Sequence, residues 1–426
     1  MIKIMKLGEV PTEEIFARVV PAMDVSAIVS EIIADVRANG DSALYRYCEK
    51  FDKAVLSTLE VTQEEIDEAF AAVEPSFLAI LEEAAANIRS FHQQQVRSSF
   101  ILTEKPGVVM GQKIMPIEKV GLYVPGGTAA YPSTVLMDAI PAKIAGCKEI
   151  VIVTPPGKDG KLPAAILAAA KIAGVTRIFK VGGAQAVAAL AYGTESIPKV
   201  DKIVGPGNAF VAEAKKQVFG TVSIDMIAGP SEILIVADGT CDARYVAADL
   251  LSQAEHDVLA SPVLVTDSRE LAEMVQTELE IQLTRLPRRQ VARKSVDDNG
   301  KIILTDDLDK AVEVVNLIAP EHLELCVDDP FAMLPKIKNA GSIFLGRYTP
   351  EALGDYFAGP NHTLPTSGTA RFSSPLSVDD FVKKSSYLYY TEEALLPVAD
   401  RIADFAQREG LYAHGQSVTA RCADKH

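Results

Sequence analysis

Four short segments of the chain combine a histidine with a carboxylate or amide side chain. They hold Gln253 with His256, Glu321 with His322, Asp355 with His362, and Glu409 with His414. Imidazoles and carboxylates can ligate zinc, and both can also move protons. The remaining histidines are His92, within a predicted helix, and His426, the last residue, and we expect both to be structural or solvated.

The first segment closes a predicted helix over Ala243–His256. Gln253 and His256 are three residues apart, so we expect them to project from one helical face. There they could share a zinc ion, although glutamine is an uncommon zinc ligand. A polar helix C-terminus, with the imidazole favourable against the helix dipole, explains the same residues. From this segment alone, the structural explanation is favoured.

The second segment is Ala319–Glu324, in which Pro320 can begin a helical turn. Neighbouring helical residues diverge, so we expect Glu321 and His322 to have separate roles. Glu321 could activate a water molecule, and His322 could remove the proton of an alcohol. The alternative is an acidic turn followed by a strand, and the segment by itself favours that alternative.

The last two segments lie at bends. Asp355 ends a short helical pattern, and the turn Gly359–His362 brings the chain back, so Asp355 and His362 could line one pocket. Gly410 is suited to the residue after a helix, which leaves His414 in a loop near Glu409. Taken alone, the first segment is better explained by the backbone requirements of its turn, and the second by a solvated loop histidine.

Glycine-rich turns follow three predicted strands, at Pro125–Gly127, Gly182–Gln185 and Gly205–Asn208. No Gly-x-Gly-x-x-Gly fingerprint of dinucleotide binding follows a strand. Glycines where a strand meets a helix let a ligand approach the backbone, and such turns form the usual crevice of an open α/β sheet. They also serve tight turns, so together they indicate a bound small molecule without identifying it.

Alternating strands and helices must position these residues. Predicted strands are Val120–Val124, Glu149–Thr154, Thr176–Val181, Lys202–Val204, Ser223–Met226, Ile233–Val236 and Pro262–Thr266. Predicted helices between and after them are Ser133–Ala145, Pro163–Ala173, Ala209–Phe219, Ala243–His256 and Arg269–Leu286. This order predicts an α/β fold with parallel sheets, and the number of strands favours two Rossmann-like units. Helical segments are predicted near both ends, at Ala27–Ala38, Ser42–Phe51, Gln63–Val73, Phe77–Val96 and Glu392–Gln407.

Composition narrows the class of protein. The chain has 426 residues and a formal net charge of −15, which disfavours nucleic acid as a partner. It lacks an apolar run long enough to cross a membrane, and its start lacks the apolar core of a signal peptide. Five widely spaced cysteines argue against a disulfide framework. We therefore expect a cytoplasmic protein that binds neither nucleic acid nor membranes.

Taken together and in order, these segments resemble the histidinol dehydrogenase family. The resemblance runs from about residue 121 to 415. It covers Gly121–Gly127, Pro132–Met137, Val181–Ala186, Val204–Phe210, Asp225–Met226, Ala228–Glu232, Asp249–His256, Ala319–Glu324, Gly354–Tyr356, Gly359–His362 and Ala413–Gly415. No one of these motifs is decisive, but the ordered set is highly specific. Family members often have Gly-Pro or Asp-Pro after the zinc-site histidine, where this chain has Asp257-Val258, a departure that bears on local loop geometry.

The resemblance implies a role for each candidate residue. Zinc would be held by Gln253, His256, Asp355 and His414. Glu321 and His322 would be the catalytic acid–base pair. The substrate L-histidinol would be contacted by Ser231, His362 and Glu409, together with His322 and the four zinc ligands. NAD would be contacted by Tyr123, Gln185 and Asn208.

The resemblance also implies an intertwined homodimer, in which Glu409 and His414 complete the partner subunit's site. The expected division is an N-terminal arm over 1–22 and a first Rossmann-like unit over 23–122 and 233–374. A second Rossmann-like unit, on the NAD side, would span 123–232. A helical C-terminal segment over 375–426 would complete the partner's site.

The implied reaction is oxidation of L-histidinol through the aldehyde to L-histidine, with two NAD, in the last steps of histidine biosynthesis. His322 would take the hydroxyl proton, and Glu321 would activate water to attack the aldehyde. Alternatives are a covalent route through Cys147 or Cys326, a zinc hydrolase that needs no NAD, a dehydrogenase of a related amino alcohol, and a silent binding paralogue. The two cysteines lie in apolar surroundings, which disfavours an activated thiolate.

Overall fold

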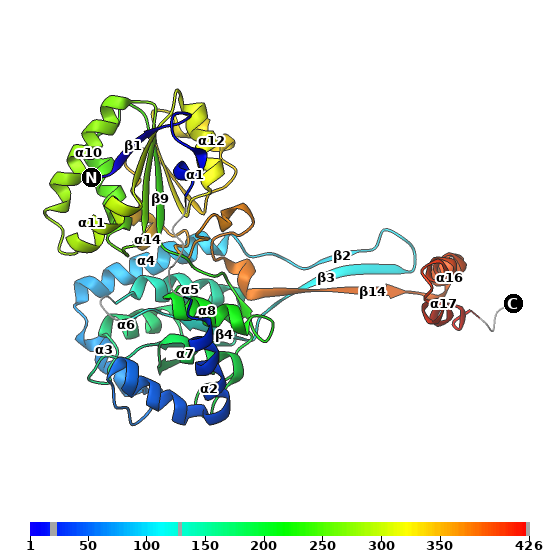
Figure 1. The fold of residues 1–426 in the computed structure, drawn as a ribbon. Helices are drawn as coiled ribbons and strands as arrows, with labels where there is room; N and C mark the ends of the chain where they lie inside the picture. Colours follow the sequence, from blue (N-terminus) through cyan, green and yellow to red (C-terminus); the bar gives the residue numbers. More distant parts are fainter. Residues whose placement is uncertain (18–23, 127–129, 423–426) are drawn as a thin grey trace. The chain divides into compact units, whose positions relative to one another are not determined.

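The computed structural model describes residues 1–17, 24–126 and 130–422. The chain divides into two compact units (Figure 1). Unit 1 consists of Met1–Gln95 and Ile117–Phe381, and unit 2 of Val96–Pro116 and Val382–His426. Gly127 of the first glycine turn, His426 and the end of the predicted arm lie outside the described residues. Every helix in the described ranges is too short or too polar to span a lipid bilayer.

The larger sheet of unit 1 has six strands, each parallel to its neighbours. Their spatial order is β1 (Lys3–Lys6), β11 (Lys301–Leu304), β10 (Ser261–Thr266), β9 (Glu232–Ala237), β12 (His322–Cys326) and β13 (Ser342–Leu345). Alternate residues of β9 face opposite sides, because side chains of a strand alternate. Ile233 and Ile235 pack in one buried cluster, while Leu234 and Val236 pack in another.

Helices cover both faces of this sheet (Figure 1). One cluster contains residues of α9 (Ala243–Ala254), α10 (Arg269–Leu283) and α11 (Arg289–Asp298), and the other contains residues of α12 (Leu308–Ile318). Shorter helices are α1 (Thr12–Ile15), α13 (Pro330–Met333) and α14 (Glu351–Tyr356). Burial on both faces explains why the strands read as continuous apolar runs.

The smaller sheet of unit 1 has five parallel strands. Their spatial order is β6 (Arg177–Lys180), β5 (Glu149–Thr154), β4 (Lys119–Tyr123), β7 (Lys202–Val204) and β8 (Ser223–Ile224). Helices α2 (Ser26–Tyr47), α7 (Gly183–Tyr192) and α8 (Ala209–Val218) pack on one face. Helices α4 (Pro75–Gln93), α5 (Pro132–Ala145) and α6 (Ala164–Ala173) pack on the other, with α3 (Gln63–Ala72) beside them.

The predicted α/β class with parallel sheets is confirmed, and the structure groups the N-terminal residues differently from the sequence-based division. That division joined 23–122 to 233–374, whereas α2 and α4 pack on the five-stranded sheet. Strand β1, within the predicted arm, pairs with β11 of the six-stranded sheet. The apolar faces of amphipathic helices specify that they are buried, but not which sheet buries them.

Unit 2 is built around an antiparallel sheet that the sequence analysis did not predict. Its strands are β14 (Val382–Tyr390), β3 (Val108–Pro116) and β2 (Phe100–Leu102), in that spatial order. The predicted helix Glu392–Gln407 is divided into α15 (Glu392–Leu395), a 3₁₀ turn over Leu396–Val398, and α16 (Ala399–Arg408). Pro397 lies in this turn. Because proline lacks the N–H that a continuous helix needs, the helix is interrupted there. Helix α17 (Tyr412–Thr419) follows.

Candidate active site

The predicted acid–base pair lies at the amino end of the six-stranded sheet. Glu321 immediately precedes β12 and His322 is its first residue, so the alternative of an acidic turn before a strand is the one observed. Ser231 immediately precedes the neighbouring strand β9, and His322 pairs in register with Ile233. Parallel pairing therefore brings two segments, about 90 residues apart in sequence, to one edge of the sheet.

The His322 ring is oriented by the backbone of β9. Its Nδ1 lies 2.9 Å from the carbonyl oxygen of Glu232, a pure acceptor, so Nδ1 carries a hydrogen and donates it. Its Nε2 lies 3.8 Å from Glu351 Oε1 and 3.8 Å from Asp355 Oδ1. Because Nδ1 is already used, Nε2 is the atom of His322 that can exchange a proton with a ligand.

Glu321 is held beside the same ring. Its Oε2 accepts a hydrogen bond from the backbone N–H of Glu232 at 2.8 Å and lies 3.6 Å from His322 Nδ1. The two side chains therefore approach each other, contrary to the divergence expected on a helix. Burial raises the pKa of Glu321 to about 7. A carboxyl with such a pKa can both accept and return a proton near neutrality.

Charge around His322 is strongly unbalanced. Burial disfavours its imidazolium, but the carboxylates of Glu321, Asp355 and Glu351 outweigh burial and raise the pKa of His322 to about 10. Burial also opposes ionisation of Asp355, yet the neighbouring rings of His322 and His362 hold its pKa below the usual range. Burial, followed by the charge of Asp355, raises the pKa of Glu351. Perturbed groups of this kind mark a candidate site of chemistry.

A metal ion fits this cluster. His322, Glu351 and Asp355 offer ligand atoms that all lie within 4.8 Å of one another. Gln253, only 1% exposed, has neither amide atom in a hydrogen bond of good geometry within the described ranges. Buried polar groups are ordinarily paired, so this amide beside carboxylates is suited to hold a metal ion. Imidazole and oxygen donors suit zinc.

Glu351 is the residue that the sequence analysis missed. It begins α14, four residues before Asp355. Its Oε2 accepts a hydrogen bond from Ser252 Oγ at 3.1 Å, and its backbone N–H donates to Glu324 Oε1 at 2.8 Å. On a helix, side chains four residues apart share a face, so the spacing of two acids before the Gly359–His362 turn was the available signal.

The other predicted residues of unit 1 surround the cluster. Gln253 lies in the last turn of α9, while His256 lies beyond its end and is exposed. Ser231 Oγ is 3.5 Å from His256 Nδ1. His362 Nδ1 lies 3.8 Å from Asp355 Oδ1 and donates to the carbonyl oxygen of Asp355 at 3.0 Å. Burial lowers the pKa of His362, although the charge of Asp355 opposes that shift.

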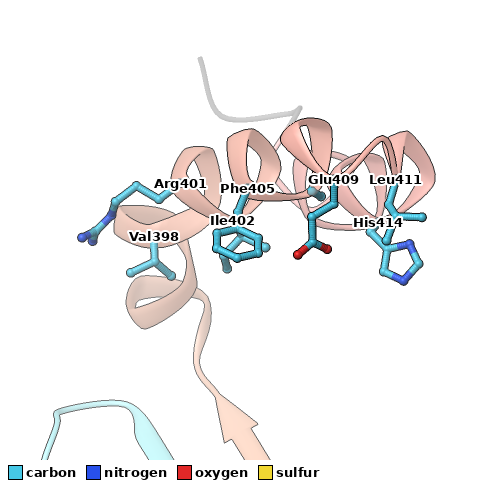
Figure 2. Close-up of a pocket in the computed structure, with 8 residues that line it drawn as sticks. Val398, Arg401, Ile402, Phe405, Glu409, Leu411 and His414 are labelled. Carbon is cyan, nitrogen blue, oxygen red and sulfur yellow. The ribbon is translucent and has the colours of Figure 1, made fainter.

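Glu409 and His414 belong to unit 2 and lie together there. Glu409 directly follows α16 and His414 lies in α17, so the prediction of a loop at His414 was wrong. Gly410, with φ +76°, comes next after Glu409, as expected of the residue after a helix, and α17 begins two residues later. Both side chains project from the same side of the helix pair (Figure 2).

They line a hollow of about 460 Å³, whose other walls include the apolar residues Ile402, Phe405 and Leu411. The hollow has no acid–base pair comparable to the one at β12. The strongly perturbed pKa values of Glu321 and His322 lie in unit 1, which makes that cluster the candidate site of proton transfer.

The predicted NAD contacts lie at the carboxyl ends of the five-stranded sheet. Tyr123 ends β4 and is buried, and its hydroxyl accepts a hydrogen bond from the Gly183 N–H at 3.0 Å. Gln185 is buried in the first turn of α7. Asn208 is exposed, and its side-chain oxygen caps α8. Strand β4 has β5 on one side and β7 on the other, so the strand order reverses between β4 and β7. Open α/β sheets usually bind ligands at such a point.

Comparison with known proteins identifies the family. The family model for histidinol dehydrogenase matches residues 18–422. Histidinol dehydrogenase from Clostridium acetobutylicum is 57% identical over 393 residues, covering 92% of this chain and 91% of that protein. The enzyme of that name from Geobacillus kaustophilus is 57% identical, with coverage of 92% and 93%. The crystal structure of histidinol dehydrogenase from Elizabethkingia anophelis has a TM-score of 0.94 at 40% identity, with coverage of 99% of this chain and 98% of that one.

Proposed function

Because the chain belongs to the histidinol dehydrogenase family, and is therefore an oxidoreductase, we propose that it oxidises L-histidinol through L-histidinal to L-histidine. This places it at the last steps of histidine biosynthesis, in the cytoplasm. The observation that carries the proposal is the buried Glu321–His322 pair beside the carboxylates of Glu351 and Asp355. A dehydrogenase that makes an acid from an alcohol needs a base for the alcohol and a base for water, and this pair supplies both.

We propose that the protein holds one zinc ion with Gln253, His256 and Asp355 and with His414 of a second copy. Support comes from the unpaired Gln253 amide, the grouped ligand atoms of Asp355 and its neighbours, and the exposed ring of His256. When bound, zinc would orient the amino alcohol and offset part of the carboxylate charge.

Proton transfer from the alcohol falls to His322. Its Nδ1 donates to the Glu232 carbonyl, so the neutral ring has its free lone pair at Nε2. Nε2 accepts the hydroxyl proton as the alcohol is oxidised, and the nearby carboxylates stabilise the imidazolium that results. The proposed contacts to the substrate are completed by Ser231, His362 and the partner's Glu409.

Glu321 acts at the aldehyde. Its carboxylate would remove a proton from water as the water attacks the aldehyde carbon, and the pKa of about 7 suits that task. A covalent route through cysteine is less well supported. Burial raises the pKa of Cys147 to about 12, and a hydrogen bond with Cys241 together with burial raises that of Cys326. Neither thiol is readily ionised, which a nucleophile requires.

We propose that NAD binds at the carboxyl ends of β4, β6 and β7, against Tyr123, Gln185 and Asn208. When bound, NAD would accept the electrons of each oxidation, two molecules being used for each L-histidine formed. The chain contributes backbone rather than charge here. A Cβ on Gly126 or on Gly182 would lie 2.6 Å from Pro155, so both turns require glycine for their close approach.

We further propose a homodimer with shared sites, because Glu409 and His414 lie in unit 2 and the remaining proposed ligands lie in unit 1. Exposed apolar side chains of α16, such as Phe405 at 66%, favour burial against another chain. The test mixes two inactive variants, Glu321→Gln and His414→Asn, by unfolding and refolding them together. Shared sites predict recovery of about a quarter of wild-type activity, since half the dimers are mixed and each has one intact site. No recovery would contradict shared sites.

The first experiment incubates the zinc-loaded protein with L-histidinol and NAD and measures both NADH and L-histidine. Two NADH per L-histidine, lost with a chelator and restored by zinc, is the expected result. Turnover of another amino alcohol but not of L-histidinol would mean that the protein is a dehydrogenase of that amino alcohol. Chelator-sensitive hydrolysis without NAD would indicate a zinc hydrolase instead. Absence of any turnover would favour a binding paralogue.

A further inference from the structure

One face of helix α5 holds three consecutive residues of the loop that carries His362. Thr134 Oγ1 lies 3.2 Å from His362 Nε2, and Asn361 Nδ2 donates to the carbonyl oxygen of Met137 at 2.6 Å. Thr363 Oγ1 donates to Asp138 Oδ1 at 2.9 Å. Positions 134, 137 and 138 have the spacing of one helical face. These contacts fix residues 361–363 of the loop to α5. Further along, Thr366 Oγ1 accepts a hydrogen bond from the Gly229 N–H, which precedes β9.

Asp138 also faces the Gly205 turn, which follows β7. Its second oxygen, Oδ2, lies 3.0 Å from where a Cβ on Gly205 would be. Gly205 has φ +108°, and that Cβ would also strike the carbonyl oxygen of Tyr123. Only glycine fits between Asp138 and the end of β4, so the carboxyl is packed directly against the turn.

The Gly205 turn is fixed from its other side by a buried ion pair. Lys215 Nζ donates to the Gly205 carbonyl oxygen at 2.9 Å and pairs with Asp225 Oδ1. Asp225 Oδ2 accepts from the Gly205 N–H at 2.8 Å. Both charged side chains are at most 2% exposed. A buried pair with these additional hydrogen bonds holds a single geometry, because losing either partner leaves an uncompensated charge.

The state of the Asp138 carboxyl follows from this packing. The side chain is fully buried, and Oδ2 has no hydrogen-bond partner within the described ranges. Burial, with the negative charge of Asp225, raises the pKa of Asp138 to about 8. A neutral carboxyl has the shape of an amide and, like it, offers an acceptor oxygen beside a donor, whereas a carboxylate would repel Asp225.

We propose that Asp138 is a positioning residue that fixes the Asn361–Thr363 loop and the Gly205 turn to one another. It does not touch the reacting atoms. The ligand assigned to each region rests on the proposed function, in which the loop contacts the substrate and the turn borders the cofactor. Asp138 then sets the relation between them, so a single side chain affects both sites.

The test measures amide hydrogen exchange in Asp138→Asn, Asp138→Leu and the wild-type protein. Asp138→Leu should raise exchange in 361–366 and in 205–208 together, by about tenfold, since it removes the acceptor of Thr363 and the packing on Gly205. Asp138→Asn should leave both segments near wild type, since the amide reproduces the neutral carboxyl. A change in one segment only, or equal damage by Asn and Leu, would overturn the proposal.

A second pair of variants guards against simple loss of folding. Thr363→Val removes the same hydrogen bond from the other side and should raise exchange in both segments, less than Asp138→Leu does. Thr176→Val is the matched control. Thr176 Oγ1 is hydrogen-bonded to the backbone of Ile150 at the amino end of the five-stranded sheet, whereas the Gly205 turn lies at its carboxyl end. This variant should leave both segments unchanged. If Thr363→Val affects only its own loop, the two regions are not coupled through Asp138.

Activity supplies the last readout. With L-histidinol and NAD, Asp138→Leu should lower kcat and raise the KM for NAD, each by about tenfold, with bound zinc unchanged. Asp138→Asn should restore both values. Unchanged kcat and KM in a folded Asp138→Leu would overturn the positioning role. If the wild-type protein does not oxidise L-histidinol, the proposed function fails, while the exchange measurements still decide whether Asp138 joins the two segments.

Discussion

The two sheets of unit 1 use opposite ends for their predicted ligands. In the five-stranded sheet the glycine turns follow the carboxyl ends of β4, β6 and β7, where open α/β sheets usually bind ligands. In the six-stranded sheet Ser231, Glu321 and His322 stand at the amino ends of β9 and β12. The proposed cofactor contacts at one end are Tyr123, Gln185 and Asn208, and the proposed proton-transfer residues at the other end are a carboxyl and an imidazole. Under the proposed function, cofactor binding and proton transfer therefore fall on different sheets.

The carboxyl end of the six-stranded sheet carries charged side chains where the other sheet has glycine turns. Its strand order reverses at β9 and β12, and Arg347 Nη2 lies there between Asp238 Oδ1 at 3.3 Å and Asp328 Oδ1 at 2.5 Å. These ion pairs lie at the carboxyl ends of β9 and β12, where the strand order reverses. Fold-level analogy would have put the chemistry there, so in this protein the perturbed groups identify the site and the topology does not.

The largest expected effect comes from the amino end of β12. His322→Asn should lower kcat by about 10²–10⁴-fold, since an amide cannot accept the alcohol proton. The KM for NAD should change little, because the proposed cofactor contacts lie on the other sheet. Steady-state kinetics measures both, with zinc content and melting temperature as checks on folding. A kcat within tenfold of wild type would remove His322 from proton transfer.

Metal binding should show the next largest effect. Asp355→Asn should weaken zinc binding by at least about 10–100-fold, judged from the cost of perturbing metal-site ligands and their partners. Zinc affinity is measured by competition with a chromogenic chelator. Glu255→Gln is the control, since Glu255 lies beside His256 but outside the proposed ligand set. Equal zinc affinity in Asp355→Asn and wild type would mean that the metal, if bound, is held elsewhere.

The dependence on pH separates the two regions further. His322 must be neutral to act as a base, and nearby carboxylates raise its pKa, so its active form grows as pH rises. The kcat should therefore fall with decreasing pH, by up to about tenfold per unit below the working pKa. The Kd for NAD should be nearly constant over the same range. A kcat that stays flat down to mildly acidic pH would rule out a neutral-histidine base.

The smallest expected effect is on the glycine side. Tyr123→Phe removes the acceptor for the Gly183 N–H and should raise the KM for NAD by up to about tenfold, with kcat at saturating NAD unchanged. Tyr192→Phe, at the other end of α7, is the matched control. If Tyr123→Phe lowers kcat and leaves the KM alone, the division between binding and proton transfer does not hold.

Several features were predictable because local chemistry specifies them. Apolar runs predicted the strands of the five-stranded sheet and, in the six-stranded sheet, β9 and β10. The two helices predicted over 27–38 and 42–51 appear largely as α2, interrupted at Gly40 by non-helical backbone. Gly410 was recognised as a helix end for its positive φ. The segments with histidine and carboxylate were also visible, since the types and spacing of side chains are properties of the sequence itself.

Other features depend on partners far away in sequence. Strands β3 and β14 pair between 108–116 and 382–390, and neither segment carries a signal for the other. Glu351 looks like an ordinary acidic residue in a first helical turn until β12 brings His322 within 3.8 Å. The sequence by itself thus determined which elements form and which residues can do chemistry. Only the tertiary structure decided which residues meet and how burial and neighbouring charge set their pKa values, because both depend on the environment that folding creates.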